Sequence, residues 1–144
     1  MDTALNLSVT DSPGAEAHQT ILGGLVASNE LRFGPSHWRP LAVLLHDDQG
    51  KIVGGLWAGT AFDWLQIELL FVPEPMRTRG TGARMLALAE EEALARGCRG
   101  AWLDTFGFQA RPFYERRGYR VVGRIDDHPR GSARYFMSKD FERA

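Results

Sequence analysis

The chain has 144 residues and a net charge of −1 at pH 7; 44% of its residues are apolar and 24% are charged. This composition is typical of a globular protein that buries a substantial core, so we expect a single domain over residues 1–144. The near-neutral charge argues against an extended surface for nucleic acid or for an anionic membrane, and neither is expected as a partner.

The sequence also lacks the signatures of several other protein classes. Cys98 stands alone and the four histidines are scattered, so neither a disulfide framework nor a metal site is expected. No apolar run approaches the roughly 20 residues that cross a bilayer. The N-terminal residues MDTALNLSV have neither the basic start nor the apolar stretch of a signal peptide, so a cytoplasmic protein is the default expectation.

The first half of the chain predicts a strand, a helix and a three-stranded meander. Weak alternation over residues 4–9 indicates the first strand. Ser12 and Pro13 are typical of a helix start, and apolar residues then keep a helical spacing to about Asn29. The meander is expected as strands over 41–45, 52–58 and 64–72, joined by turns over 46–50 and 59–63.

The second half predicts a helix flanked by strands, followed by a short helix and two further strands. The pattern ARMLALAEEEALAR indicates a helix that ends at about Arg96, and Glu90, Glu91 and Glu92 are expected on its solvated face. A strand–helix–strand unit of this kind should be parallel and right-handed. The later elements are expected as a strand over 101–106, a helix over 109–117 and strands over 119–125 and 134–138.

A glycine loop, Arg77-x-x-Gly80-x-Gly82, separates the third meander strand from the helix. Strand, glycine loop and helix in this order can bind phosphate. Glycines let the backbone approach an anion, and the first N–H groups of the helix point toward it. The helix dipole and the guanidinium groups of Arg77, Arg79 and Arg84 add positive charge.

Two common nucleotide motifs do not fit this loop. The Walker loop requires Lys-Ser or Lys-Thr after its glycines, and the dinucleotide fingerprint requires glycine or alanine where Met85 stands. The loop instead resembles that of the GNAT acyltransferases, whose signature is Arg/Gln-x-x-Gly-x-Gly/Ala after a strand.

A second motif adds to this resemblance. Ala110-x-x-Phe113-Tyr114-x-x-x-Gly118-Tyr119 is similar to the Ala-x-x-x-Tyr-x-x-x-Gly-Phe/Tyr helix of the same family. With the order of elements, the chain resembles the GNAT superfamily over nearly its whole length. The resemblance implies an α/β (α+β) fold. Its central sheet would be mixed, mostly antiparallel and six- to seven-stranded, with two splayed parallel strands and helices on both faces.

The resemblance implies acetyl-CoA as co-substrate, held between the strands over 64–72 and 101–106. Backbone groups at the end of the first strand would pair with pantetheine and polarise the thioester carbonyl, and the glycine loop would hold the pyrophosphate. Thr78 departs from a common glycine, and Gly107 departs from an asparagine whose contact Gln109 could supply. The expected cofactor-binding residues are Leu70, Phe71, Val72, Arg77, Thr78, Arg79, Gly80, Thr81, Gly82, Ala83 and Gln109.

Direct attack of an amine on a thioester requires two proton transfers and no nucleophile from the protein. Glu68 stands in the apolar run QIELLFV and could accept the amine proton through a water, or could simply face outward from the strand. Tyr114 matches the family's acid for the leaving thiolate, or could be a core tyrosine. Asp104 could orient the acceptor, pair with an arginine or replace Glu68 as the base, and His128 could contact substrate.

The leading interpretation is an N-acetyltransferase that moves the acetyl group of acetyl-CoA to a primary amine of a small molecule within a ternary complex. The alternatives are an acetyltransferase acting on a lysine or N-terminus of a protein or peptide, and a CoA-binding module without catalysis. Aromatic residues in the meander could line an acceptor pocket, belong to the core or form a homodimer surface. The identity of the acceptor is left open.

Overall fold

The computed structural model describes residues 5–142, and the chain forms two compact units that divide after Ser36. In the first unit, α1 (Gly14–Arg32) follows Pro13, which is the N-cap. The strand expected over residues 4–9 is wrong for its described part, because residues 5–10 have no regular structure. Its alternation is weak, and such a strand needs a partner to satisfy its backbone; Ala4 lies outside the described residues. The single-domain expectation stays a prediction.

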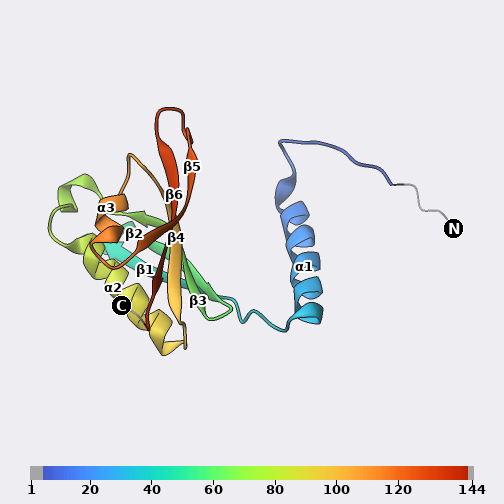
Figure 1. Cartoon of the computed structure of the whole chain (residues 1–144), viewed down its shortest axis with the longest axis horizontal. Coiled ribbons are helices and arrows are strands. Elements are labelled where there is room, and N and C mark those ends of the chain that lie inside the picture. The colour runs from blue at the N-terminus through green and yellow to red at the C-terminus, as the bar shows by residue number, and fades with distance from the viewer. Residues whose placement is uncertain (1–4, 143–144) are drawn as a thin grey trace. The chain divides into compact units, whose positions relative to one another are not determined.

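The second unit is a six-stranded sheet in the order β1-β2-β3-β4-β6-β5 (Figure 1). Its strands are β1 (Arg39–His46), β2 (Ile52–Ala61), β3 (Trp64–Phe71), β4 (Gly100–Phe106), β5 (Arg120–Asp126) and β6 (Ala133–Asp140). All neighbouring pairs are antiparallel except β3 and β4, which are parallel. The expected α/β class with a mixed, mostly antiparallel sheet is therefore confirmed.

Three helical segments connect these strands. A 3₁₀ turn, η1 (Glu74–Met76), follows β3 and leads through the glycine loop into α2 (Thr81–Ala95), while α3 (Arg111–Glu115) follows β4. Helices α2 and α3 lie on the same side of the sheet (Figure 1) and contribute to one core. Among the described helices, none is both long enough and apolar enough to span a membrane.

The core forms where one face of α2 meets the sheet. Leu86, Ala89 and Ala93 of α2 are buried at spacings of three and four residues, as expected for a helix with one apolar face. Their partners include Leu56, Leu65, Leu103 and Met137, each 1% exposed or less. Each such side chain contributes about 1.5–3 kcal/mol by leaving water, and this packing fixes the strands that carry the site.

Two sequence-based predictions in this unit are wrong. The turn expected over 59–63 is shorter, because β2 continues to Ala61 and only Phe62 and Asp63 form the turn, both with positive φ. Gly59 instead permits a close approach, since a Cβ there would lie 2.9 Å from the Trp38 indole nitrogen. Glu90, expected on the solvated face of α2, has a side chain only 15% exposed because it accepts hydrogen bonds from the sheet side.

Candidate functional site

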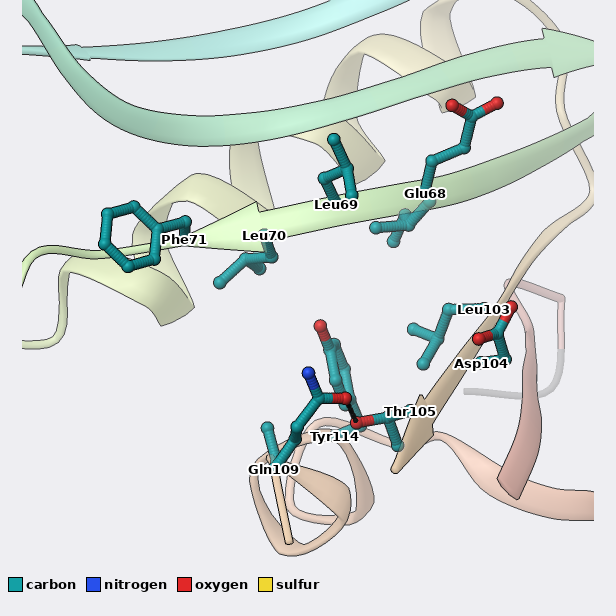
Figure 2. Close-up of a pocket in the computed structure, with 11 residues that line it drawn as sticks. Glu68, Leu69, Leu70, Phe71, Leu103, Asp104, Thr105, Gln109 and Tyr114 are labelled. Carbon is teal, nitrogen blue, oxygen red and sulfur yellow. Dashed lines mark hydrogen bonds between the residues drawn. The ribbon is translucent and has the colours of Figure 1, made fainter. Parts of the chain in front are cut away.

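The site begins where the two parallel strands separate. The pairing of β3 with β4 covers Trp64–Ile67 and Gly100–Leu103 and ends there. A cavity of about 300 Å³ lies beyond the last pair. It is lined by Ile67, Glu68, Leu69, Leu70, Phe71, Leu103, Asp104, Thr105, Gln109, Ala110 and Tyr114 (Figure 2). The expected splay of these two strands is therefore present.

A β-bulge centred on Glu68 shapes one wall of the cavity. In the β2–β3 ladder Trp57 pairs with Leu69 and Ala58 pairs with Ile67. Glu68 is therefore an extra residue without a cross-strand partner on β2. Ile67 belongs to the buried core and Leu70 packs against it, three positions later instead of the usual two. Bulges of this kind re-aim side chains near functional sites. Glu68 and Leu69 consequently both stay exposed.

The two candidate catalytic side chains line the same cavity from different directions. The Tyr114 hydroxyl points toward β3 near Leu70, whereas the Glu68 carboxylate points to the other side of β3 (Figure 2). Glu68 is exposed, while Tyr114 is 6% exposed. Burial raises the pKa of Tyr114 to about 12, so its hydroxyl keeps its proton at neutral pH.

Gln109 closes the cavity beside Tyr114. Its Oε1 accepts hydrogen bonds from the Phe106 backbone N–H at 2.8 Å and from the Thr105 hydroxyl at 3.3 Å. These bonds fix the turn between β4 and α3, and the amide nitrogen faces the cavity (Figure 2). Gln109 thus presents a donor to whatever lies between the strands.

The glycine loop forms the N-terminus of α2. Gly80 is the N-cap in a left-handed conformation with φ of 75°. The Arg84 N–H donates to the Gly80 carbonyl oxygen, so the N–H groups of Thr81, Gly82 and Ala83 lie ahead of the helix's own hydrogen-bond pattern. No atom lies within 4 Å of a Cβ built at Gly80. The helix start is therefore open to an anion.

The remaining loop residues surround this opening without lining the cavity. Arg77 donates from Nε to the Val72 carbonyl oxygen at 2.8 Å, and Thr78 has a positive φ of 66°. Arg79 is exposed, and Val72 is 9% exposed at the end of the core. The structure thus divides the predicted cofactor-binding residues between the cavity and the loop at the start of α2.

Asp104 forms an ion pair beside the cavity. The sequence offered pairing with an arginine as one of three roles for this residue, beside orienting the acceptor and acting as the base. Asp104 lines the cavity, and its Oδ1 accepts a hydrogen bond from Arg134 Nε at 2.9 Å and lies 2.7 Å from Arg134 Nη2 in an ion pair. Arg134 also lies 3.3 Å from the His128 Nε2 and over the rings of Phe106 and Phe136. No sequence spacing signals this pair, because it depends on the β4–β6 register.

These elements together can hold an extended ligand with an anionic end. The start of α2 offers N–H groups and nearby cationic side chains, and the splayed strands offer a partly apolar cleft. The Tyr114 phenol lines the cleft on one side, and the Glu68 carboxylate points to the other side of β3. No group of three or more metal-ligating side chains occurs over residues 5–142.

Comparison with known proteins adds independent findings. Residues 15–119 match a family profile described as "Acetyltransferase (GNAT) family". The acetyltransferase Atu2258 of Agrobacterium fabrum is 41% identical over 137 residues, which cover 95% of this chain and 100% of the relative. Blasticidin-S acetyltransferase of Streptomyces morookaense is 37% identical over 94 residues, covering 65% of this chain and 69% of the relative.

The fold is likewise similar to a crystal structure of a proposed acetyltransferase from Agrobacterium tumefaciens. The TM-score is 0.91 at 41% identity, and the match covers 95% of this chain and 100% of the other. The profile match includes the glycine loop and both parallel strands, so sequence likeness extends across the elements that form the cavity and the loop.

Proposed function

Since the chain belongs to the GNAT family of acetyltransferases, we propose that it transfers the acetyl group of acetyl-CoA to a primary amine of a small molecule by direct attack in a ternary complex. The observation that carries the proposal is the cavity at the separation of β3 and β4, followed along the chain by the open start of α2.

The residues present fit acetyl-CoA. The N–H groups of Thr81, Gly82 and Ala83, with Arg77, Thr78 and Arg79 around Gly80, would hold the pyrophosphate. The backbone of β3 at Leu70 and Phe71, continuing to Val72, would pair with the pantetheine arm, and the Gln109 amide would reach it from the opposite wall. Acetyl-CoA supplies an activated thioester when bound.

Glu68 is proposed as the general base, acting through a water. An alkyl amine has a pKa near ~10 and arrives protonated at neutral pH, so it must lose a proton before it can attack. The bulge leaves the Glu68 carboxylate in solvent at the rim of the cavity, where it can receive that proton and release it to water.

Tyr114 is proposed as the general acid. Its hydroxyl points toward β3 beside the cavity (Figure 2), where it would reach the sulfur of a thioester held along that strand. A pKa of about 12 keeps the phenol protonated until the thiolate forms. Burial raises the pKa of both groups, so a thiolate formed in the same dry cleft would have a raised pKa of its own and could then compete for the Tyr114 proton.

The acceptor class is proposed from chemistry and from one relative. Glu68 and Asp104 are both residues of the cavity wall, and acidic side chains close to the cleft suit a cationic amine, although Asp104 is paired with Arg134 and the Glu68 carboxylate points to the other side of β3. Blasticidin-S acetyltransferase is named for a small-molecule antibiotic, and this favours a small amine over a peptide. Asp104, fixed by Arg134, would orient the acceptor.

The test is release of CoA thiol from acetyl-CoA with a panel of small amines, aminoglycoside-like and nucleoside-like amines and blasticidin S. Peptides with a lysine or a free N-terminus are the matched alternative acceptors. Amine-dependent thiol release, with an acetylated product identified by mass, is the expected result. Turnover on peptides alone would make the protein a peptide acetyltransferase, and CoA binding without turnover of any acceptor would make it a non-catalytic module.

A further inference from the structure

A buried polar cluster, formed by Glu90 of α2, Tyr119 before β5 and Lys139 of β6, joins the helix to the sheet. The Tyr119 hydroxyl donates to Glu90 Oε2 at 2.7 Å, and Lys139 Nζ donates to Glu90 Oε1 at 2.9 Å. The Glu90 and Lys139 side chains are 15% and 16% exposed, and Tyr119 is 3% exposed. Both carboxylate oxygens are therefore committed inside the protein.

The cluster holds Tyr119 in one orientation. Burial and the negative charge of Glu90 both raise the pKa of Tyr119, so its hydroxyl remains the donor. The Lys139 ammonium lies 5.8 Å from the centre of the Tyr119 ring, and the Lys139 stem passes Gly118, where a Cβ would lie 3.3 Å from Lys139 Cε. The ring is thus fixed at its hydroxyl and along its face.

Tyr119 in turn forms one wall for the Tyr114 ring. The two rings meet edge to face at 5.7 Å, and Phe113 meets the Tyr114 ring at 5.1 Å. The Tyr119 N–H also donates to the Tyr114 carbonyl oxygen at 3.1 Å, so backbone and ring are both constrained. A rotation of Tyr119 would remove the support that directs the Tyr114 hydroxyl toward β3.

We propose that Glu90 and Tyr119 are positioning residues for the general acid: Glu90 holds Tyr119, and Tyr119 holds the Tyr114 ring with its hydroxyl toward the leaving sulfur. The inference rests on the proposed acid role of Tyr114. A buried ion pair is weak evidence for stability, because apolar side chains of similar volume often stabilise a core as well or better. Its place directly behind Tyr114 fits a requirement for a fixed geometry.

The test is a double-mutant cycle on the full chain. Tyr119→Phe keeps the ring but removes the bond to Glu90, and we expect kcat to fall by roughly 3- to 10-fold, the effect of about one hydrogen bond. KM for acetyl-CoA should stay within about twofold, because the ring and loop remain. In a Tyr114→Phe background, Tyr119→Phe should cost nothing further, since the group that it positions is gone.

Controls separate positioning from general damage. Glu91→Gln removes the adjacent, exposed carboxylate of the same helix and should leave kcat unchanged. Calorimetric CoA affinity checks that each variant folds. An equal fall for Tyr119→Phe with or without the Tyr114 hydroxyl would overturn the inference, as would an unchanged kcat. If Tyr114→Phe itself loses nothing, the acid assignment fails first and the inference fails with it.

Discussion

Arg77 Nε donates a 2.8 Å hydrogen bond to the carbonyl oxygen of Val72, which joins the first residue of the glycine-loop motif to the end of the strand that lines the cavity. The Arg77 guanidinium also lies over the Phe71 ring, 5.9 Å from its centre. A guanidinium has further N–H donors beyond Nε, so this bond sets its orientation without exhausting it. Arg77 can therefore support the loop through Nε and bind a phosphate through its other N–H groups at the same time.

Replacement of Arg77 should separate these two contributions. We expect Arg77→Ala to weaken CoA binding by roughly 10- to 100-fold, the effect of losing a charge-assisted hydrogen bond. Binding of pantetheine, which lacks the phosphates, should weaken much less. Isothermal calorimetry with both ligands measures the difference. Equal losses for both would mean that Arg77 acts only through the bond to Val72.

Gly80 and Gly97 offer a matched pair at the two ends of α2. Both have positive φ, 75° and 85°, and both have open space where a Cβ would lie. Leucine at either position should cost about 1–2 kcal/mol of backbone strain and lower the melting temperature by several degrees. Only Gly80→Leu should weaken CoA binding, because only that side chain would occupy the space above the helix start. Similar CoA affinities for the two variants would contradict a phosphate site at Gly80.

Glu68→Gln should lower kcat/KM at neutral pH by roughly 10²–10⁴-fold, the usual contribution of a general base. The loss should shrink as pH rises toward the pKa of the acceptor amine, because free amine then arrives without help. Rates from about pH 6 to pH 10 with one accepted amine provide the measurement, and Asp104→Asn, measured in parallel, tests the alternative base. A Glu68→Gln enzyme as fast as the parent at neutral pH would remove Glu68 from the mechanism and point to Asp104 or a chain of waters.

Tyr114 should make the free energy of unfolding fall as the pH rises above about 10. Its pKa is about 12 in the folded chain, against ~10 for an exposed tyrosine. The stabilisation is therefore complete below about pH 10 and is lost as pH rises through about 12, where the unfolded chain is already ionised. Tyr114→Phe should remove up to about 3 kcal/mol of the fall in unfolding free energy across that interval. Urea unfolding at several pH values would refute this if parent and variant fell in parallel.

Local signals explain which parts of the fold could be predicted. Gly97 follows the end of α2 as expected, and the glycine loop follows β3 as the sequence indicates, whereas α3 covers only Arg111–Glu115 of the helix expected over 109–117. The predicted turn is misplaced because Gly59 is interpreted as a turn residue. A glycine is required there because the Trp38 indole lies close to it, and no local sequence pattern reveals that contact. The exposure predicted for Glu90 is wrong for the same kind of reason, because its partners are distant in sequence: Lys139 lies in β6 and Tyr119 lies just before β5.

The site shows the same division. The motif containing Tyr114 and the loop containing Gly80 could be recognised because they are contiguous in sequence. The pairing of Asp104 with Arg134 spans 30 positions and follows from strand register, so the sequence offered it only as one alternative. The catalytic roles of Glu68 and Tyr114 stay predictions, and the experiments above decide them.

The extra residue in β3, Glu68, determines which of the following side chains face the cavity. Strands place alternate side chains on alternate faces, so one inserted residue exchanges the faces for everything that follows it. If the same residues alternated regularly with no bulge at Glu68, Leu69 would turn into the core and Leu70 would turn away from Tyr114's side of the sheet. Surface turns of this chain can gain or lose residues at little cost. Within β3, outside the bulge, a single inserted or deleted residue would reverse the faces of the cavity-lining end.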